Sequence, residues 1–303
     1  MRRSPGAETV GALFVALAAL LFGGTVIFGK LLADRDFPVT SMLAIRFGTA
    51  ALLLAGTLGV LRRSIRPAGG EAVPLAVLGA VGYAAESSLF FLGLKNGTVA
   101  GITLLFFTYP VWVAVLSAAL GMGVPGLLLS GSLVAAVAGA GLVVGGSGGV
   151  SASAAGVAFA LSSALTFSLY MIGADRFLRR TSPLVSAMWV SGSASLMLAV
   201  LAVASGGGRL PADLPEWGSV LGMGAFTAGA FTSLFVGLRR LGAVRTSVIA
   251  AMEPVAASVM AALFLGEAVR AATVAGGVLI LAGAVAATLA RSKTVEETEP
   301  LGP

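Results

Sequence analysis

Three ionisable residues lie deep inside long apolar stretches of this sequence, namely Arg46, Glu86 and Glu253. A charged side chain inside a membrane is costly, so each of them is a functional candidate by default. Low dielectric disfavours the charged form of a carboxyl group. Glu86 or Glu253 could therefore bind a proton on one side of a membrane and release it on the other. The alternatives are structural: a buried hydrogen bond for Glu86, satisfied backbone donors for Glu253, and a carboxylate or carbonyl partner for Arg46.

Aromatic residues accompany these charges at helical spacing. Tyr83 and Glu86 share one helical face, because side chains three or four residues apart lie above one another. Aromatic walls with a few fixed polar groups suit a small amphipathic solute. These faces predict one central substrate cavity, lined by Tyr83, Glu86, Tyr109, Trp112, Tyr170, Trp189 and Glu253. Arg46 either lines this cavity as well or has a structural role. The polar face of the Tyr170 helix is predicted to include Ser162 and Thr166, and the aromatic residues could instead pack or anchor at interfaces.

Two prolines lie at equivalent places in two of the apolar runs, Pro110 and Pro254. Proline removes a backbone donor and frees a carbonyl group one turn earlier. Both residues therefore predict helix breaks, which would bend each helix and offer a polar group to the cavity.

The residue types that are absent exclude several chemistries. The chain has no cysteine and no histidine, so disulfides, thiolate catalysis, Ser–His pairs and the commonest metal ligands are ruled out. We expect no metal site, no cofactor and no enzyme activity. The net charge of +6 does not indicate a nucleic-acid surface, because the arginines lie in short connections between apolar runs.

The elements that must position these residues are membrane helices. Hydrophobic types make up 57% of the 303 residues and charged types 11%, against about 25% charged in a soluble domain. A spanning helix needs roughly 20 apolar residues. The sequence predicts an all-α integral membrane protein with ten transmembrane helices, near 10–33, 38–61, 72–94, 98–120, 125–145, 153–175, 183–204, 217–238, 243–265 and 270–290.

The loop charges predict orientation. With a cytoplasmic amino terminus, the cytoplasmic loops hold most of the basic residues, which include clusters at 62–66, 176–180 and 239–245. The positive-inside rule therefore favours both termini in the cytoplasm. The polar tail 291–303 is predicted to be a disordered cytoplasmic segment. Arginine exceeds lysine, and Ala and Gly are abundant, which hints at a GC-rich bacterial genome and a plasma-membrane location.

The two halves of the chain repeat. An offset of about 144 residues places Gly93 on Gly237 and Pro110 on Pro254. This predicts two five-helix repeats, residues 10–145 and 153–290. Because five is odd, the second repeat enters the membrane from the opposite side. Inverted repeats are a common design of secondary transporters; the alternative is gene duplication in a protein that does not transport.

Small residues recur on the helices that close the two repeats. They are Gly131, Ala135 and Gly139 in the first repeat, and Gly276 and Gly283 in the second. Such stripes let helices approach closely. They indicate core packing within the chain or, alternatively, a homodimer interface.

Local motifs follow a fixed order along the chain. They are Phe37-Pro38, Arg46-Phe47, Gly93-Leu94, Thr108-Tyr109-Pro110, Glu253-Pro254, Leu265-Gly266-Glu267, Gly276 and Gly283. The order of these motifs resembles that of the EamA branch of the drug/metabolite transporter superfamily, and the resemblance covers the chain from about Val10 to Ala290. The resemblance implies export or exchange of small metabolites, often amino acids or drug-like compounds, through a central cavity. One departure is Gly123, which stands where the second repeat has Glu267.

The leading functional hypothesis is a secondary transporter that works by alternating access in the lipid bilayer, with a small-molecule substrate and with protons as a candidate coupling ion. A channel or a non-transporting membrane scaffold is the alternative. A membrane-embedded enzyme is disfavoured, because no catalytic cluster is apparent and 145–149 lacks the Lys and Ser/Thr of a phosphate loop.

Overall fold

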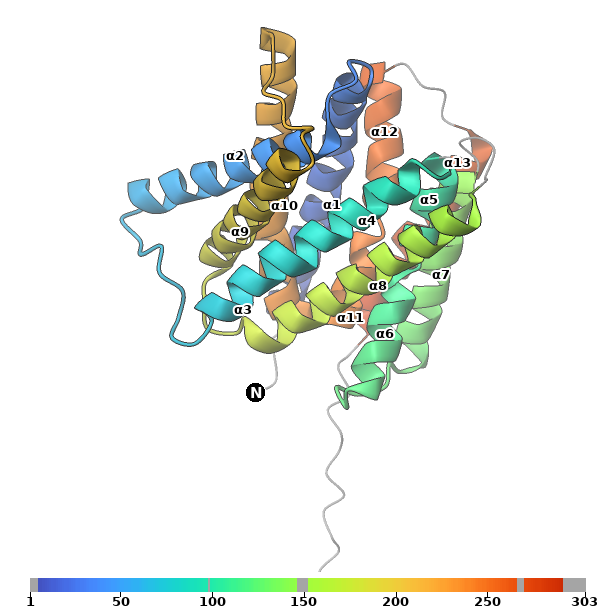
Figure 1. The fold of residues 1–303 in the computed structure, drawn as a ribbon. Helices are drawn as coiled ribbons and strands as arrows, with labels where there is room; N and C mark the ends of the chain where they lie inside the picture. Colours follow the sequence, from blue (N-terminus) through green and yellow to red (C-terminus); the bar gives the residue numbers. More distant parts are fainter. Residues whose placement is uncertain (1–4, 98, 146–151, 266–269, 291–303) are drawn as a thin grey trace, which may run out of the picture.

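The computed structural model describes residues 5–97, 99–145, 152–265 and 270–290, and these form helices without an extended strand (Figure 1). The predicted tail 291–303 and Glu267 lie outside the described residues. The elements are α1 (Pro5–Ala33), α2 (Val39–Val60), α3 (Ala72–Val77), η1 (Leu78–Tyr83), α4 (Ala84–Leu94), α5 (Val99–Phe106), α6 (Tyr109–Ala119), α7 (Leu127–Gly145), α8 (Ala154–Phe177), α9 (Pro183–Ala204), α10 (Leu214–Leu241), α11 (Ala243–Ala250), α12 (Glu253–Leu265) and α13 (Ala271–Leu289).

The prediction of ten membrane helices is confirmed. Ten helical stretches of the described residues are long and apolar enough to cross a membrane. Seven of them are single helices, whereas three are interrupted: α3–η1–α4, α5–α6 and α11–α12. Only helices and closed barrels satisfy their backbone groups in lipid, which is why hydropathy predicts these elements well. The cytoplasmic placement of both termini stays a prediction.

The helices pack as two related halves. Helix α1 of the first repeat lies against α10 of the second, and the equivalent pair is α8 of the second repeat against α4 of the first. The pairs α2–α9 and α7–α13 each join equivalent helices of the two repeats. Figure 1 shows α2 and α9 together at one side of the bundle and α7 at the other. The fold is therefore a two-repeat architecture in which each half completes the other.

Glycines set the spacing between α7 and α13. A Cβ atom added to Gly139 would lie 2.6 Å from the carbonyl oxygen of Gly276 and 2.9 Å from the backbone nitrogen of Ile280. A Cβ atom added to Gly283 would likewise lie close to α7, 2.9 Å from the carbonyl oxygen of Ser132. These glycines pack inside the chain, whereas Gly131 faces open space. A homodimer stays a prediction, and these three glycines no longer support it.

The π-helix η1 marks a difference between the repeats. An offset of 145 residues pairs Gly79 with Gly224, whereas an offset of 144 pairs Gly93 with Gly237. The first repeat therefore has one more residue between its two glycines. A π-helix bonds residue i to residue i+5 and so takes up an extra residue, and such turns are frequent at functional sites. The extra residue coincides with η1, just before Glu86, while α10 is continuous.

Arg245 has a different environment from the one expected of a loop charge. It lies in α11, is only 5% exposed, and donates from Nε to the carbonyl of Ala287 (3.0 Å) and from Nη2 to that of Thr288 (2.7 Å). Nη2 also pairs with Glu8 of α1 at 3.1 Å. A cation at the end of α13 satisfies carbonyl groups that have no partner within the helix. Arg245 therefore ties the first and last helices together.

Candidate functional site

The centre of the bundle is a cluster of aromatic rings, which we call the aromatic centre: Tyr83, Tyr109, Phe167, Tyr170 and Phe231. Tyr83 of η1 lies edge-on to Phe231 of α10 (ring centroids 4.7 Å apart) and to Tyr170 of α8 (5.3 Å). Tyr109 of α6 meets Phe167 of α8 at 4.9 Å. All five side chains are buried. In this conformation packed rings occupy the place where the sequence predicts a cavity.

Arg46 of α2 enters this region from the side. Its side chain is buried, and Nε donates to the hydroxyl of Thr227 on α10 at 2.7 Å. The charged groups that act on the guanidinium are Glu253 and Glu86, with Tyr83 beside them. Among the described residues no carboxylate forms a direct ion pair with Arg46. The attraction between its guanidinium and the two carboxylates therefore acts over a longer distance than a salt bridge. The structure thus brings the three predicted charges into one electrostatic group.

Glu86 of α4 is buried and held by two hydroxyl groups. Ser87 donates to Oε2 at 2.9 Å. The hydroxyl of Ser163, on α8, lies 3.3 Å from Oε1 and 3.0 Å from the carbonyl oxygen of Glu86. Hydrogen bonds to a carboxylate compensate part of its desolvation cost. Ser163 therefore ties Glu86 of the first repeat to the second repeat.

The helix interruptions face each other near this centre. Two residues separate the end of α5 from Tyr109, the first residue of α6, and two residues separate the end of α11 from Glu253, the first residue of α12. The Tyr109 hydroxyl donates to the carbonyl of Ser247 on α11 at 3.3 Å. Glu253 is only half-buried, unlike Glu86. A helix amino terminus favours a negative charge, which suits Glu253 at that position.

Two residues predicted to line the cavity lie elsewhere. Trp112 of α6 is 36% exposed on the outer surface of the bundle. The indole N–H of Trp189 donates to the carbonyl of Ile65 at 2.9 Å, in the loop before α3. The structure brings Tyr83, Glu86, Tyr109 and Tyr170 together with Arg46 and Glu253, but not these two tryptophans.

Several residues of the centre were not singled out from the sequence. They are Ser163, Phe167, Thr227 and Phe231. Ser163, Phe167 and Tyr170 share a helical face at spacings of four and three, whereas the predicted Ser162 is exposed. On α10, the four-residue spacing from Thr227 to Phe231 indicates in the same way that these two side chains share a face.

Some buried hydroxyl groups, one of them in the aromatic centre, have no hydrogen-bond partner among the described residues. They belong to Ser117, Tyr170, Ser191 and Thr246. Buried polar groups usually have a partner, so each of these is a candidate contact for a polar solute. Ser191 occupies the position of the second repeat that Arg46 has in the first. In the described part of the chain, no group of three or more acidic side chains could hold a metal ion.

The comparisons with known proteins agree with this architecture. The model of the EamA-like transporter family matches residues 9–145 and 154–289. A solved structure titled "Crystal structure of protein" is similar to the chain with a TM-score of 0.80 and 20% identity, over 93% of this chain and 97% of that one. That likeness shows the fold alone. No curated protein matches the chain.

Proposed function

Because the chain belongs to the EamA-like transporter family, we propose that it is a secondary transporter that exports or exchanges small metabolites by alternating access. The observation that carries this proposal is the group of buried Arg46, buried Glu86 and half-buried Glu253 beside the aromatic centre. Both repeats contribute to it, at the point where two helices are interrupted. Charges at this depth are expensive and mark substrate or ion pathways.

The arrangement suits a small solute with both polar and apolar parts. The guanidinium of Arg46 would attract an acidic group, and Glu86 or Glu253 would attract an amine. The rings of the aromatic centre would cover the apolar part. Amino acids and drug-like amines or aromatics fit this description, and the rings must move apart to admit them. A filled centre favours a carrier over a permanently open channel.

Coupling to protons is a further part of the proposal. Glu86 is occluded, whereas Glu253 keeps part of its surface accessible. A proton that reaches Glu253 from one side could accompany the change of access. We also propose that the protein lies in the plasma membrane of a bacterium with both termini inside. That orientation rests on the basic loops at 62–66 and 176–180.

The experiment begins with a resistance screen, in which cells that overproduce the protein are challenged with toxic amino acid and drug analogues. The compound that is tolerated is then followed in proteoliposomes, with and without a pH gradient. Saturable uptake with counter-flow supports a carrier. Flux that does not saturate would indicate a channel, and no flux would indicate a scaffold.

The carboxyl groups are tested in the same vesicles. Glu86→Gln and Glu253→Gln should each abolish the dependence on the pH gradient, because neither amide can carry the proton. Asp36→Asn is the matched control, since Asp36 is an exposed carboxylate in the loop before α2. If both glutamine variants keep the gradient dependence, coupling through these residues is wrong, and an uncoupled facilitator or exchanger remains.

A further inference from the structure

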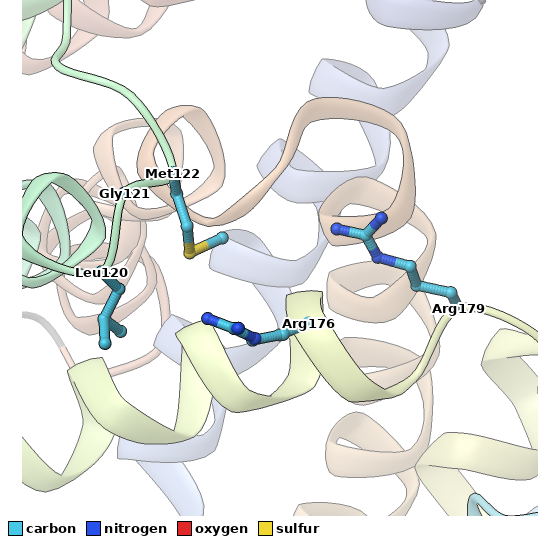
Figure 2. A pocket seen from close by; sticks show the side chains of 5 residues that line it. All are labelled: Leu120, Gly121, Met122, Arg176 and Arg179. Carbon is cyan, nitrogen blue, oxygen red and sulfur yellow. The ribbon is translucent and has the colours of Figure 1, made fainter.

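An open pocket lies away from the aromatic centre, at the face of the bundle where α6 and α8 end. Its cavity volume is about 410 Å³, and its lining is Leu120, Gly121, Met122, Arg176 and Arg179. Figure 2 shows Arg176 and Arg179 extending from the end of α8 and the chain after it toward Met122. The volume lies within the range of small-ligand sites. Two cations and no acidic side chain line it, so the ligand it fits is an anion.

The segment that carries Arg179 is fixed by a buried carboxylate. Glu71, 7% exposed, accepts hydrogen bonds from the backbone N–H groups of Arg179 (3.1 Å), Arg180 (2.9 Å) and Thr181 (2.8 Å). Arg239 also donates to the carbonyl of Thr181 at 3.1 Å. Among the described residues, the side chain of Arg179 donates only from Nε, to the carbonyl of Asp175 at 3.2 Å. The terminal nitrogens of Arg179 are therefore presented to the pocket by a backbone that Glu71 fixes, and the exposed Arg176 is presented by the last turn of α8.

The surroundings of the pocket are apolar and exposed. Leu120 is 49% exposed and Met122 37%, and they form one wall of the pocket. The chain continues to Val124 and Leu127, which are 82% and 92% exposed. An anion from the aqueous phase gains nothing from such neighbours, whereas the acyl chains of a lipid would cover them.

The loop of the first repeat that matches the segment of Arg176 and Arg179 has a different charge. In the first repeat the matching loop, after α1, reads Asp34-Arg35-Asp36, and Arg35 pairs with Asp213 at 2.5 Å. Most of the basic loop residues therefore lie on the side of this pocket, whereas Leu31 and Asp34 stand at the positions of the first repeat that are equivalent to Arg176 and Arg179. A signal for orientation needs only charge on that side. It requires neither a pocket nor a fixed backbone.

We propose that this pocket binds the phosphate headgroup of an anionic phospholipid from the adjacent leaflet, with Arg176 and Arg179 as its ligands. Basic pockets between membrane helices on the cytoplasmic side are suited to anionic headgroups. Arginine matches phosphate geometry with paired donors. The acyl chains lie along Leu120, Met122 and the start of α7. The site is separate from the aromatic centre and does not depend on the proposed transport.

The test is native mass spectrometry of the full-length protein in mild detergent, titrated with palmitoyl-oleoyl phosphatidylglycerol and, separately, phosphatidylcholine. The wild-type protein should bind one phosphatidylglycerol more tightly than phosphatidylcholine. Arg176→Gln/Arg179→Gln should weaken that first step about thirtyfold, since each arginine that contacts the headgroup contributes about 1 kcal/mol and every 1.4 kcal/mol is tenfold. Arg62→Gln/Arg63→Gln is the matched control, because it removes the same charge from an exposed loop on the same face. The control should change binding less than twofold.

Three outcomes would overturn the proposal: the pocket variant binds phosphatidylglycerol as the wild type does, the control variant weakens it equally, or millimolar inorganic phosphate displaces the lipid fully. The second would show a diffuse charge effect, and the third a site for free phosphate. Circular dichroism and size-exclusion chromatography check the fold of each variant. If the double variant does not fold, Arg176→Gln alone decides the matter, because Arg176 is exposed on the last turn of α8.

Discussion

Replacement of Gly139 by alanine tests how closely the two closing helices of the repeats pack. The added Cβ would lie 2.6 Å from the carbonyl oxygen of Gly276 and within 2.9 Å of Ile280 on α13. Backbone atoms cannot rotate away, so α7 and α13 would have to separate. Overpacking of this kind costs about 1–3 kcal/mol. Alanine recovers at most about 1 kcal/mol through its higher helix propensity, so we expect a net loss of stability.

Gly131→Ala is the matched control for this prediction. Gly131 lies on the same helix, and nothing lies within 4 Å of the position of its added Cβ. Only the propensity gain then applies, so this variant should equal or exceed the wild type in stability. Thermal unfolding in detergent, followed by tryptophan fluorescence, compares the three proteins. Equal melting temperatures for Gly139→Ala and Gly131→Ala would refute the packing argument. A change of oligomeric mass in Gly131→Ala alone would instead support a homodimer through this stripe.

Three further predictions concern the centre and the faces of the bundle. Thr227→Val should destabilise the protein by about 1.5–3 kcal/mol, because Arg46 loses its buried acceptor; Thr227→Ser should restore stability in the same thermal assay. Burial alone would raise the pKa of Glu71, but hydrogen bonds from Thr181, Arg180 and Arg179 lower it below its ordinary value of 4.5. Its stabilising effect is therefore present at neutral pH and is lost as the pH falls through the lowered pKa, so Glu71→Gln should melt earlier than the wild type at pH 7 and approach it in acid. Deletion of Val81 from η1 should leave a folded, monodisperse protein, because α10 crosses the equivalent stretch with one residue fewer; aggregation on size-exclusion chromatography would show that the π-helix is required for folding.

The membrane helices were predictable because lipid leaves the backbone no alternative to internal hydrogen bonding. The faces of those helices were harder to assign. Lipid tails are as apolar as leucine, so the outer and inner faces of α8 do not differ in hydropathy. An error of one residue rotates a side chain by about 100°, which is the difference between the predicted Ser162 and the Ser163 that contacts Glu86. The same ambiguity assigned Trp189 to the cavity, although its indole anchors a loop.

The change of repeat offset was readable in the sequence, but its structural meaning was not. The two offsets show only that one residue is added somewhere between Gly79 and Gly93. An extra residue in a membrane helix can be placed in a kink, a loop or a π-helix. The structure shows that the extra residue is placed in the π-helix η1, so the whole span stays helical. Gly79 can therefore still pack against α9, and Gly93 against α8.

The scaffold is duplicated, whereas its charges are not. Arg46 has Ser191 as its repeat equivalent, Glu86 has Ala230 and Glu253 has Tyr109. If the two repeats exchange conformations during transport, the same backbone movement carries two charges in one half and a single carboxylate in the other. The two end states of such a cycle are then similar in shape but different in electrostatic energy. A substrate or proton that binds between Arg46 and the carboxylates would shift that difference, and a ligand shifts an equilibrium only through its differential affinity for the two states. The asymmetry of the charges is therefore the feature through which a symmetric scaffold can favour one of its two end states.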